Sequence, residues 1–329
     1  MAIETDLCVA VTGATGTLGF GLVPLLQADG RVSRLVGIAR RPFEPADHGW
    51  TKMEYRRGDV RDQHRLQEAF RGADVVVHLA FLVIGGKRQT TRTVNIDGTI
   101  NAFRAASAAG ARRFVFASSV AAYGFHRDNP VRMTEDWPAR PAASLSYAQE
   151  KAELENILQT EAAAHPGIAL YLLRPPVVLG PHAIGAKKGL RPLAALGRDT
   201  QGRLRRLPVR VPALVPDLPV QFIHEDDLGR ALLQCVVGAG PPGAYNVAAD
   251  DVLSLVDVAR ELGLIPIRVP AGSVASAARL AARLPLLPSG LRWLEVFSHP
   301  PIMDTTRAKT HLDWAPRYTA LEAVRDTLE

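Results

Sequence analysis

Leu7-Cys-Val-Ala-Val-Thr-Gly13-Ala-Thr-Gly16-Thr-Leu-Gly19 is the stretch that decides the fold. It starts as an apolar run and ends in a turn with three glycines, after which residues 17–28 show apolar side chains at helical spacing. Such glycines allow a tight turn, close approach of the backbone to a pyrophosphate and close helix packing. The helix start adds free N–H groups for the phosphates. At the first strand–helix junction, this spacing predicts a dinucleotide site.

Apolar runs and amphipathic stretches alternate beyond this turn. Strands are expected at 35–39, 53–56, 75–79, 114–117 and 168–173, and helices at about 62–71, 94–109 and 146–164. Continuous apolar strands that alternate with helices predict an α/β fold with a doubly wound parallel sheet of the Rossmann type.

The pattern changes after Gly180-Pro181, where residues 182–219 are rich in Pro, Gly and Arg. A strand at 220–223, which is expected to rejoin the large sheet, and a helix at 226–237 follow. We therefore expect an NAD(P)-binding domain over 1–180, rejoined by about 220–250. Residues 181–219 and 251–329 would form a smaller, mostly helical C-terminal substrate domain.

Composition excludes several classes of protein. The 329 residues contain no apolar run of about 18 residues, which predicts no membrane span. The acidic start lacks the layout of a signal peptide, and the two cysteines, Cys8 and Cys235, are interpreted as reduced core thiols of a cytoplasmic protein. Since no Cys/His cluster has ligand spacing, no metal site is expected.

The formal net charge of +6 includes a basic segment between His182 and Arg210. Aromatic residues make up only 6% of the chain, and most arginines are scattered, so nucleic acid binding is not expected. The segment is either a solvated loop or a site for an anionic substrate or membrane headgroup. The expected partner is therefore a small-molecule substrate, whose anionic character stays open.

The cofactor type depends on the end of the second strand, Gly37-Ile-Ala-Arg40-Arg41. An NAD site usually carries an acid there for the ribose 2′-OH. Two guanidinium groups stand here instead, which favours NADP, with NAD as the alternative. Asp59, after the third strand, is placed to accept a bond from the adenine amino group or to cap the helix that starts near Asp62.

Tyr147 and Lys151 lie one helical turn apart, so their side chains project from one face. A nearby ammonium stabilises a phenolate and is expected to move the pKa of Tyr147 toward the working range. Ser119 ends a parallel strand, at the edge where ligands bind in such sheets. Its hydroxyl is expected to hold the substrate oxygen.

Taken together, these motifs resemble those of the extended short-chain dehydrogenase/reductase family, also called the NAD-dependent epimerase/dehydratase family. Nearly the whole chain takes part in the resemblance, through His78-Leu-Ala80, Asn95-Ile-Asp-Gly-Thr-Ile-Asn, Phe116-Ala-Ser-Ser119-Val-Ala-Ala-Tyr-Gly124, Arg174-Pro-Pro-Val-Val-Leu-Gly-Pro181, Phe222-Ile-His-Glu-Asp-Asp-Leu228, Tyr245-Asn-Val247 and Leu312-Asp-Trp-Ala-Pro316.

The resemblance implies catalytic roles for Ser119, Tyr147 and Lys151: carbonyl polarisation, general acid/base catalysis, and ribose binding with tuning of the tyrosine. It implies a homodimer through the helices at 94–109 and 146–164. The cofactor-binding residues expected from the motifs and the resemblance are Gly13, Gly16, Thr17, Leu18, Gly19, Arg40, Arg41, Asp59, Val60, Leu79, Ala80, Asn95, Lys151 and Pro176.

Departures from the family narrow the chemistry. Val120 and Ala121 replace the Asp-Glu pair of the 4,6-dehydratases, so dehydration by that route is not expected. Val177 and Val220 replace an Asn and an Arg that contact the diphosphate of sugar nucleotides. The leading hypothesis is an NAD(P)-dependent oxidoreductase acting on a ketone or secondary alcohol. A nucleotide-sugar 4-epimerase and a non-catalytic, cofactor-sensing binding protein are the alternatives.

Overall fold

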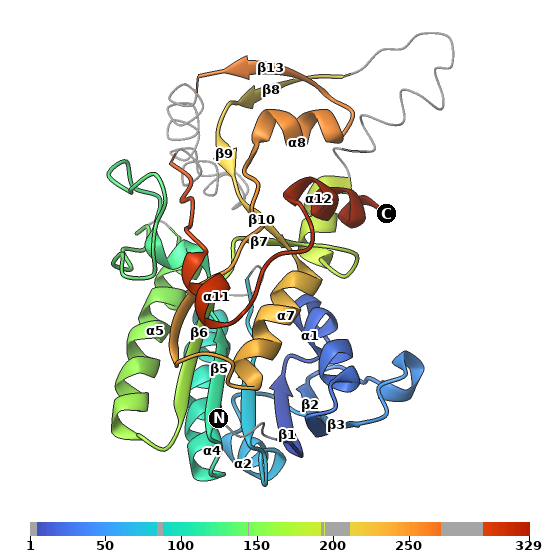
Figure 1. Ribbon diagram of the computed structural model, residues 1–329, viewed down its shortest axis with the longest axis vertical. Coiled ribbons are helices and arrows are strands. Elements are labelled where there is room, and N and C mark those ends of the chain that lie inside the picture. The colour runs from blue at the N-terminus through green and yellow to red at the C-terminus, as the bar shows by residue number, and fades with distance from the viewer. Residues whose placement is uncertain (1–4, 84–87, 144, 192–193, 195–210, 271–298) are drawn as a thin grey trace.

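A seven-stranded parallel sheet organises the computed structural model, which describes residues 5–83, 88–143, 145–191, 194, 211–270 and 299–329 (Figure 1). The strand order β11-β6-β5-β4-β1-β2-β3 reverses direction between β1 and β4. Ligands bind at such a switch point in doubly wound sheets. The predicted α/β fold is therefore confirmed, with strands β1 Leu7–Thr12, β2 Val32–Ala39, β3 Met53–Arg57, β4 Val75–His78, β5 Arg113–Ala117, β6 Ala169–Arg174 and β11 Gly243–Asn246.

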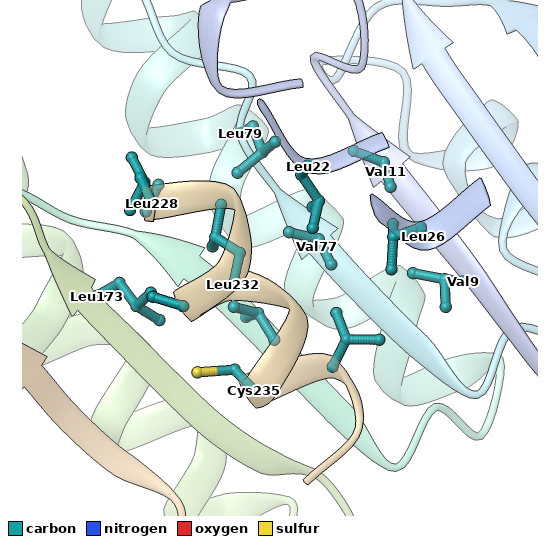
Figure 2. Packing of buried hydrophobic residues seen from close by; sticks show 14 of the residues in the cluster. Val9, Val11, Leu22, Leu26, Val77, Leu79, Leu173, Leu228, Leu232 and Cys235 are labelled. Atoms are coloured by element: carbon teal, nitrogen blue, oxygen red, sulfur yellow. The ribbon is translucent and has the colours of Figure 1, made fainter. Parts of the chain in front are cut away.

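Helices cover both faces of this sheet. Helices α1 (Thr17–Ala28) and α7 (Glu225–Val236) pack on one face, where Figure 2 shows their leucines against Val9, Val11 and Val77. The other face carries α2 (Gln63–Ala69), α4 (Gly98–Ala108) and α5 (Ser146–Ala164). Both cysteines are buried and free: Cys235 lies in the first hydrophobic core, under α1 and α7, and Cys8 in the second, under α2, α4 and α5. The continuous burial of β1 explains why its sequence is apolar throughout.

Glycines allow α1 and α7 to touch. A Cβ at Gly229 would lie 2.0 Å from the carbonyl oxygen of Gly21. Gly229→Ala is therefore expected to force the two helices apart and to lower the free energy of unfolding by about 3 kcal/mol. Urea unfolding measures the change. Gly189→Ala is the control, because nothing lies within 4 Å of that position; an equal loss in both variants would contradict the packing argument.

The strand expected near residue 220 does not rejoin the large sheet, so that prediction is wrong. Instead, β9 (Pro219–Val220) pairs with β12 (Leu253–Ser254), and β10 (Phe222–His224) pairs with β7 (Val177–Leu179). The chain passes Pro175-Pro176 between β6 and β7, so the β7–β10 pair forms a separate ladder from the large sheet. The strand that does return to the sheet is β11, beside β6.

A third core lies beyond the sheet, at the top of Figure 1. Helices α8 (Leu255–Glu261) and α12 (Ala320–Leu328) contribute to it, and α11 (Thr306–His311) follows the undescribed residues 271–298. The C-terminal part is largely helical, as predicted. It also contains an unpredicted parallel pair, β8 (Pro212–Pro216) and β13 (Ile265–Val269). In the described part of the chain, no helix is long and apolar enough to cross a membrane.

Candidate active site

The three glycines lie where β1 meets α1, and two of them have steric reasons to be glycine. Gly13 has a φ of 73°, and a Cβ there would lie 2.7 Å from the backbone nitrogen of Ala80. A Cβ at Gly19 would lie 2.1 Å from the carbonyl oxygen of Ala14. Among the described residues, no side chain caps α1 at Gly16. The N–H groups of the first turn therefore face the switch point without a side-chain acceptor, as a phosphate site requires.

A buried hydrogen-bond chain joins the last residues of β1 and β4, on either side of the switch point, to helix α4. The hydroxyl of Thr12 bonds to Nδ1 of His78 (2.8 Å), and Nε2 of His78 bonds to the hydroxyl of Thr99 (3.0 Å). Thr99 donates its own proton to the carbonyl of Asn95, so Nε2 of His78 is the protonated nitrogen. Burial lowers the pKa of His78 to about 3, which keeps the ring neutral. The network fixes the ends of β1 and β4 relative to α4.

Asn95 fixes the loop after β4. It lies in a π-helical turn, Thr93–Asp97, between α3 (Arg88–Arg92) and α4. Its side-chain oxygen accepts from the backbone N–H of Leu82, and its amide donates to the carbonyl of Leu82 and to the buried carboxylate of Glu150 (2.7 Å). The residue expected beside the cofactor thus holds the loop that continues from Leu79 and Ala80.

Ser119 follows β5 and starts a short 3₁₀ turn, Val120–Tyr123, by accepting a hydrogen bond from the N–H of Ala121. A buried polar network supports this turn. Its central pair is Arg174 and Glu155, whose side chains lie 2.5 Å apart. Arg174 also donates to the hydroxyl of Tyr123, and Ser118 donates to Glu155. The network therefore joins the ends of β5 and β6 to α5.

The structure brings Ser119, Tyr147 and Lys151 together at the carboxyl edge of the sheet. The side chain of Ser119 lies close enough to the hydroxyl of Tyr147 to lower the pKa of that tyrosine in part. Nζ of Lys151 lies 5.8 Å from the centre of the Tyr147 ring and donates to the carbonyl of Ala117 (2.6 Å). Burial lowers the pKa of Lys151 to about 7, although the charges of Glu155 and Glu150 raise it in part.

One expectation about Tyr147 is wrong for this structure. Its pKa is raised by burial, although the interaction with Ser119 lowers it in part. The ammonium of Lys151 points instead at Ala117 and lies 3.5 Å from the centre of the Phe81 ring. Burial also lowers the pKa of Lys151 itself. The lysine therefore does not lower the pKa of Tyr147 here.

Arg40 and Arg41 are exposed directly after β2, and neither forms an ion pair with any described residue. Asp59 follows β3, where its carboxylate accepts from Nε of Arg61 (2.9 Å). The suggestion that Asp59 caps α2 is wrong, because Asp62 is the capping residue and accepts from the N–H of Arg65. Asp59 sits instead in a turn that leads into the buried Val60.

The valines that replace polar family residues have different surroundings. Val177 is 43% exposed at the start of β7, next to Pro176. Val220 is only 9% exposed and belongs to the third core, so its side chain is unable to contact a ligand from solvent. The sequence predicts the basic segment before β8 to be either a solvated loop or an anion site. Five of its arginines lie outside the described residues: Arg198, Arg203, Arg205, Arg206 and Arg210.

Sequence reasoning missed two residues of the site. The Phe81 ring stands edge-on to Tyr147 at 5.7 Å, besides lying over Lys151. His182 accepts a hydrogen bond from the hydroxyl of Thr17 through its carbonyl oxygen, and its ring lies 2.6 Å from Glu225. No short motif contains either contact, since the partners are far apart in the sequence. No metal-binding group of His, Cys, Asp and Glu occurs among the residues that the structure describes.

The fold and the glycine-lined turn define a dinucleotide-binding α/β protein. The chain belongs to the NAD dependent epimerase/dehydratase family, whose model matches residues 9–248. An uncharacterized protein of Mycobacterium tuberculosis is 28% identical over 325 residues, which cover 97% of this chain and 82% of that protein. The family resemblance found in the sequence is thereby confirmed.

Two further relatives carry descriptive names. The ceramide reductase of Caulobacter vibrioides is 32% identical over 235 residues, which cover 71% of this chain and 62% of that protein. The UDP-glucose-4-epimerase of Stenotrophomonas maltophila, crystallised with bound NAD and formylated UDP-arabinopyranose, superimposes with a TM-score of 0.73. That match covers 98% of this chain and 97% of the epimerase at 20% identity, so it supports the fold alone.

Proposed function

We propose that this protein is an NADP(H)-dependent oxidoreductase that interconverts a ketone and a secondary alcohol. The observation that supports the proposal is that Ser119, at the end of β5, meets Tyr147 and Lys151, which lie one helical turn apart on α5 with Nζ of Lys151 5.8 Å from the centre of the Tyr147 ring. The bound nicotinamide would supply or accept the hydride. Ser119 would hold the substrate oxygen, and Tyr147 would donate the proton to it during reduction. Lys151 would bind the nicotinamide ribose.

The residues at the switch point fit such a cofactor. The uncapped start of α1 suits its pyrophosphate, and the loop of Leu79 and Ala80 approaches Gly13 from the other side. Arg40 and Arg41 suit a 2′-phosphate, since both guanidinium groups are exposed and no described acid pairs with them. These features support NADP over NAD, although the solved relative named above contains NAD.

Nucleotide-sugar 4-epimerisation is the second candidate, favoured by the Stenotrophomonas epimerase and its ligand. Val177 and the buried Val220 speak against it, because neither side chain offers a charge or a hydrogen bond to a diphosphate. Dehydration has less support still, since Val120 and Ala121 are unable to transfer protons. The name of the Caulobacter relative favours net reduction.

A cofactor-sensing role without turnover is the third candidate. The complete set of Ser119, Tyr147 and Lys151 speaks against it, because a protein without catalysis has no need for a proton donor beside its cofactor. The homodimer through α4 and α5, the cytoplasmic location and an anionic substrate all stay predictions.

Arg40→Ala tests the cofactor assignment. Loss of one charge-assisted hydrogen bond to the 2′-phosphate is expected to raise the Kd of NADPH about 10-fold or more, while the Kd of NADH changes less than about 2-fold. Fluorescence titration with each cofactor measures both constants. Arg34→Ala is the control, because Arg34 lies earlier in β2 and pairs with Glu54. A protein that prefers NADH and is indifferent to Arg40→Ala would refute the assignment.

A further inference from the structure

Three consecutive carbonyl groups at the end of β2 are held by two side chains of the neighbouring strand. The hydroxyl of Tyr55 donates to the carbonyl of Ala39 (3.0 Å) and also contacts that of Arg41. Nε of Arg57 donates to the carbonyl between them, that of Arg40 (3.0 Å). Tyr55 and Arg57 both belong to β3, the edge strand of the large sheet.

The sheet itself does not hold this turn. The β2–β3 ladder ends with the pair of Ala39 and Arg57, followed by one bond from the N–H of Gly58 to the carbonyl of Ala39. Arg40 and Arg41 lie past that point and are exposed. The direction of their side chains therefore depends on the contacts that Tyr55 and Arg57 make with the backbone.

Charge at this turn also favours an anion. Arg57 is exposed, and no described carboxylate pairs with it, so three guanidinium groups come from adjacent strand ends. The acid nearest to Arg57 in the sequence is Asp59, which follows β3 and is already bound by Arg61 through Nε and a terminal nitrogen. The phenol of Tyr55 stays a donor, because burial raises its pKa.

The Tyr55 ring is anchored independently of its hydroxyl. It lies 5.5 Å from the ring of Phe43, which itself packs on Trp50. Removal of the hydroxyl alone would therefore leave the ring in place and free only the turn. Tyr55→Phe therefore tests the hydroxyl contacts without disturbing the packing of the ring.

We propose that Tyr55 and Arg57 are specificity-determining positioning residues, which fix the Arg40-Arg41 turn for the 2′-phosphate of NADP. The inference rests on the proposed cofactor. A turn held in place loses less conformational freedom when the phosphate binds, which strengthens binding without any new contact. NADH, which lacks that phosphate, gains nothing from the turn.

The test is titration of NADPH and NADH into the wild-type protein and the variants Tyr55→Phe and Arg57→Ala. Tyr55→Phe is expected to raise the Kd of NADPH about 5-fold, and Arg57→Ala about 10-fold, with NADH affected less than about 2-fold. Tyr171→Phe is the matched control, since it removes a hydroxyl that donates to the carbonyl of Gly240 at the opposite side of the sheet. Neither Kd should change there.

The ratio of the two constants separates positioning from general damage. A loosened fold would weaken NADPH and NADH equally, and that result would overturn the inference. If the ratio of the two Kd values changes in Arg40→Ala but not in Tyr55→Phe or Arg57→Ala, the positioning role is wrong, whereas the proposed cofactor still holds. A wild-type protein that binds NADH more tightly than NADPH would overturn the inference and the proposed cofactor together.

Discussion

Tyr147→Phe is expected to lower kcat for ketone reduction about 10²–10⁴-fold, the range that a positioned general acid contributes. The substitution removes only the hydroxyl, which interacts with Ser119. The ring would keep its edge-on contact with Phe81 and its place on α5. The Kd of NADPH is therefore expected to change less than about 2-fold, so the loss would fall on the chemical step.

The measurement is NADPH oxidation with a panel of ketones, beside fluorescence titration of the cofactor. Ser119→Ala should reduce turnover as well, because it removes the other hydroxyl of the pair. Tyr171→Phe, which alters a tyrosine far from the site, should leave turnover unchanged. Full activity in Tyr147→Phe would show that another group donates the proton.

Glu155→Gln is expected to destabilise the protein by about 3–5 kcal/mol. Glu155 is 2% exposed and Arg174 5% exposed, and several hydrogen bonds join them. Removal of one charge leaves the other buried without compensation, which costs far more than the pair contributes as a whole. With entropy scaled to this chain length, Tm should fall by about 4–7 °C.

Glu153→Gln provides a matched control on the same helix. Glu153 also pairs with an arginine, Arg92, at 2.5 Å, but both side chains are more than one third exposed. Solvent screens such a pair, so its loss should cost at most about 1 kcal/mol. Differential scanning calorimetry on both variants decides the matter. Equal shifts of Tm in Glu155→Gln and Glu153→Gln would show that burial of the ion pair does not determine the cost of breaking it.

The large sheet follows from local sequence patterns. Its strands are apolar runs because helices bury both faces, and the helix from Ser146 to Ala164 has the bounds that its pattern predicts. The reactive side chains follow as well, since Ser119 ends a strand and Tyr147 and Lys151 share a helix face. Parallel strands bring their carboxyl ends to one edge, which makes these residues neighbours.

Other features depend on contacts between distant residues and leave no local signal. Strands β8 and β13 are not predicted from the sequence because they contain prolines, at 212, 216 and 266, and proline within an apolar run argues against a strand. Phe81 meets Lys151 from a different element, 70 positions away. The pKa of Tyr147 depends on the direction that Lys151 takes, and the spacing along the helix does not specify it.

The proposed oxidoreductase activity is tested most directly by the ratio of NADPH oxidised to secondary alcohol formed when the wild-type protein acts on a ketone. One NADPH should be consumed for each alcohol produced, and the hydride from nicotinamide C4 should be retained in the product. Interconversion of UDP-glucose and UDP-galactose with no net change in the cofactor would contradict the proposed activity and would establish the epimerase instead.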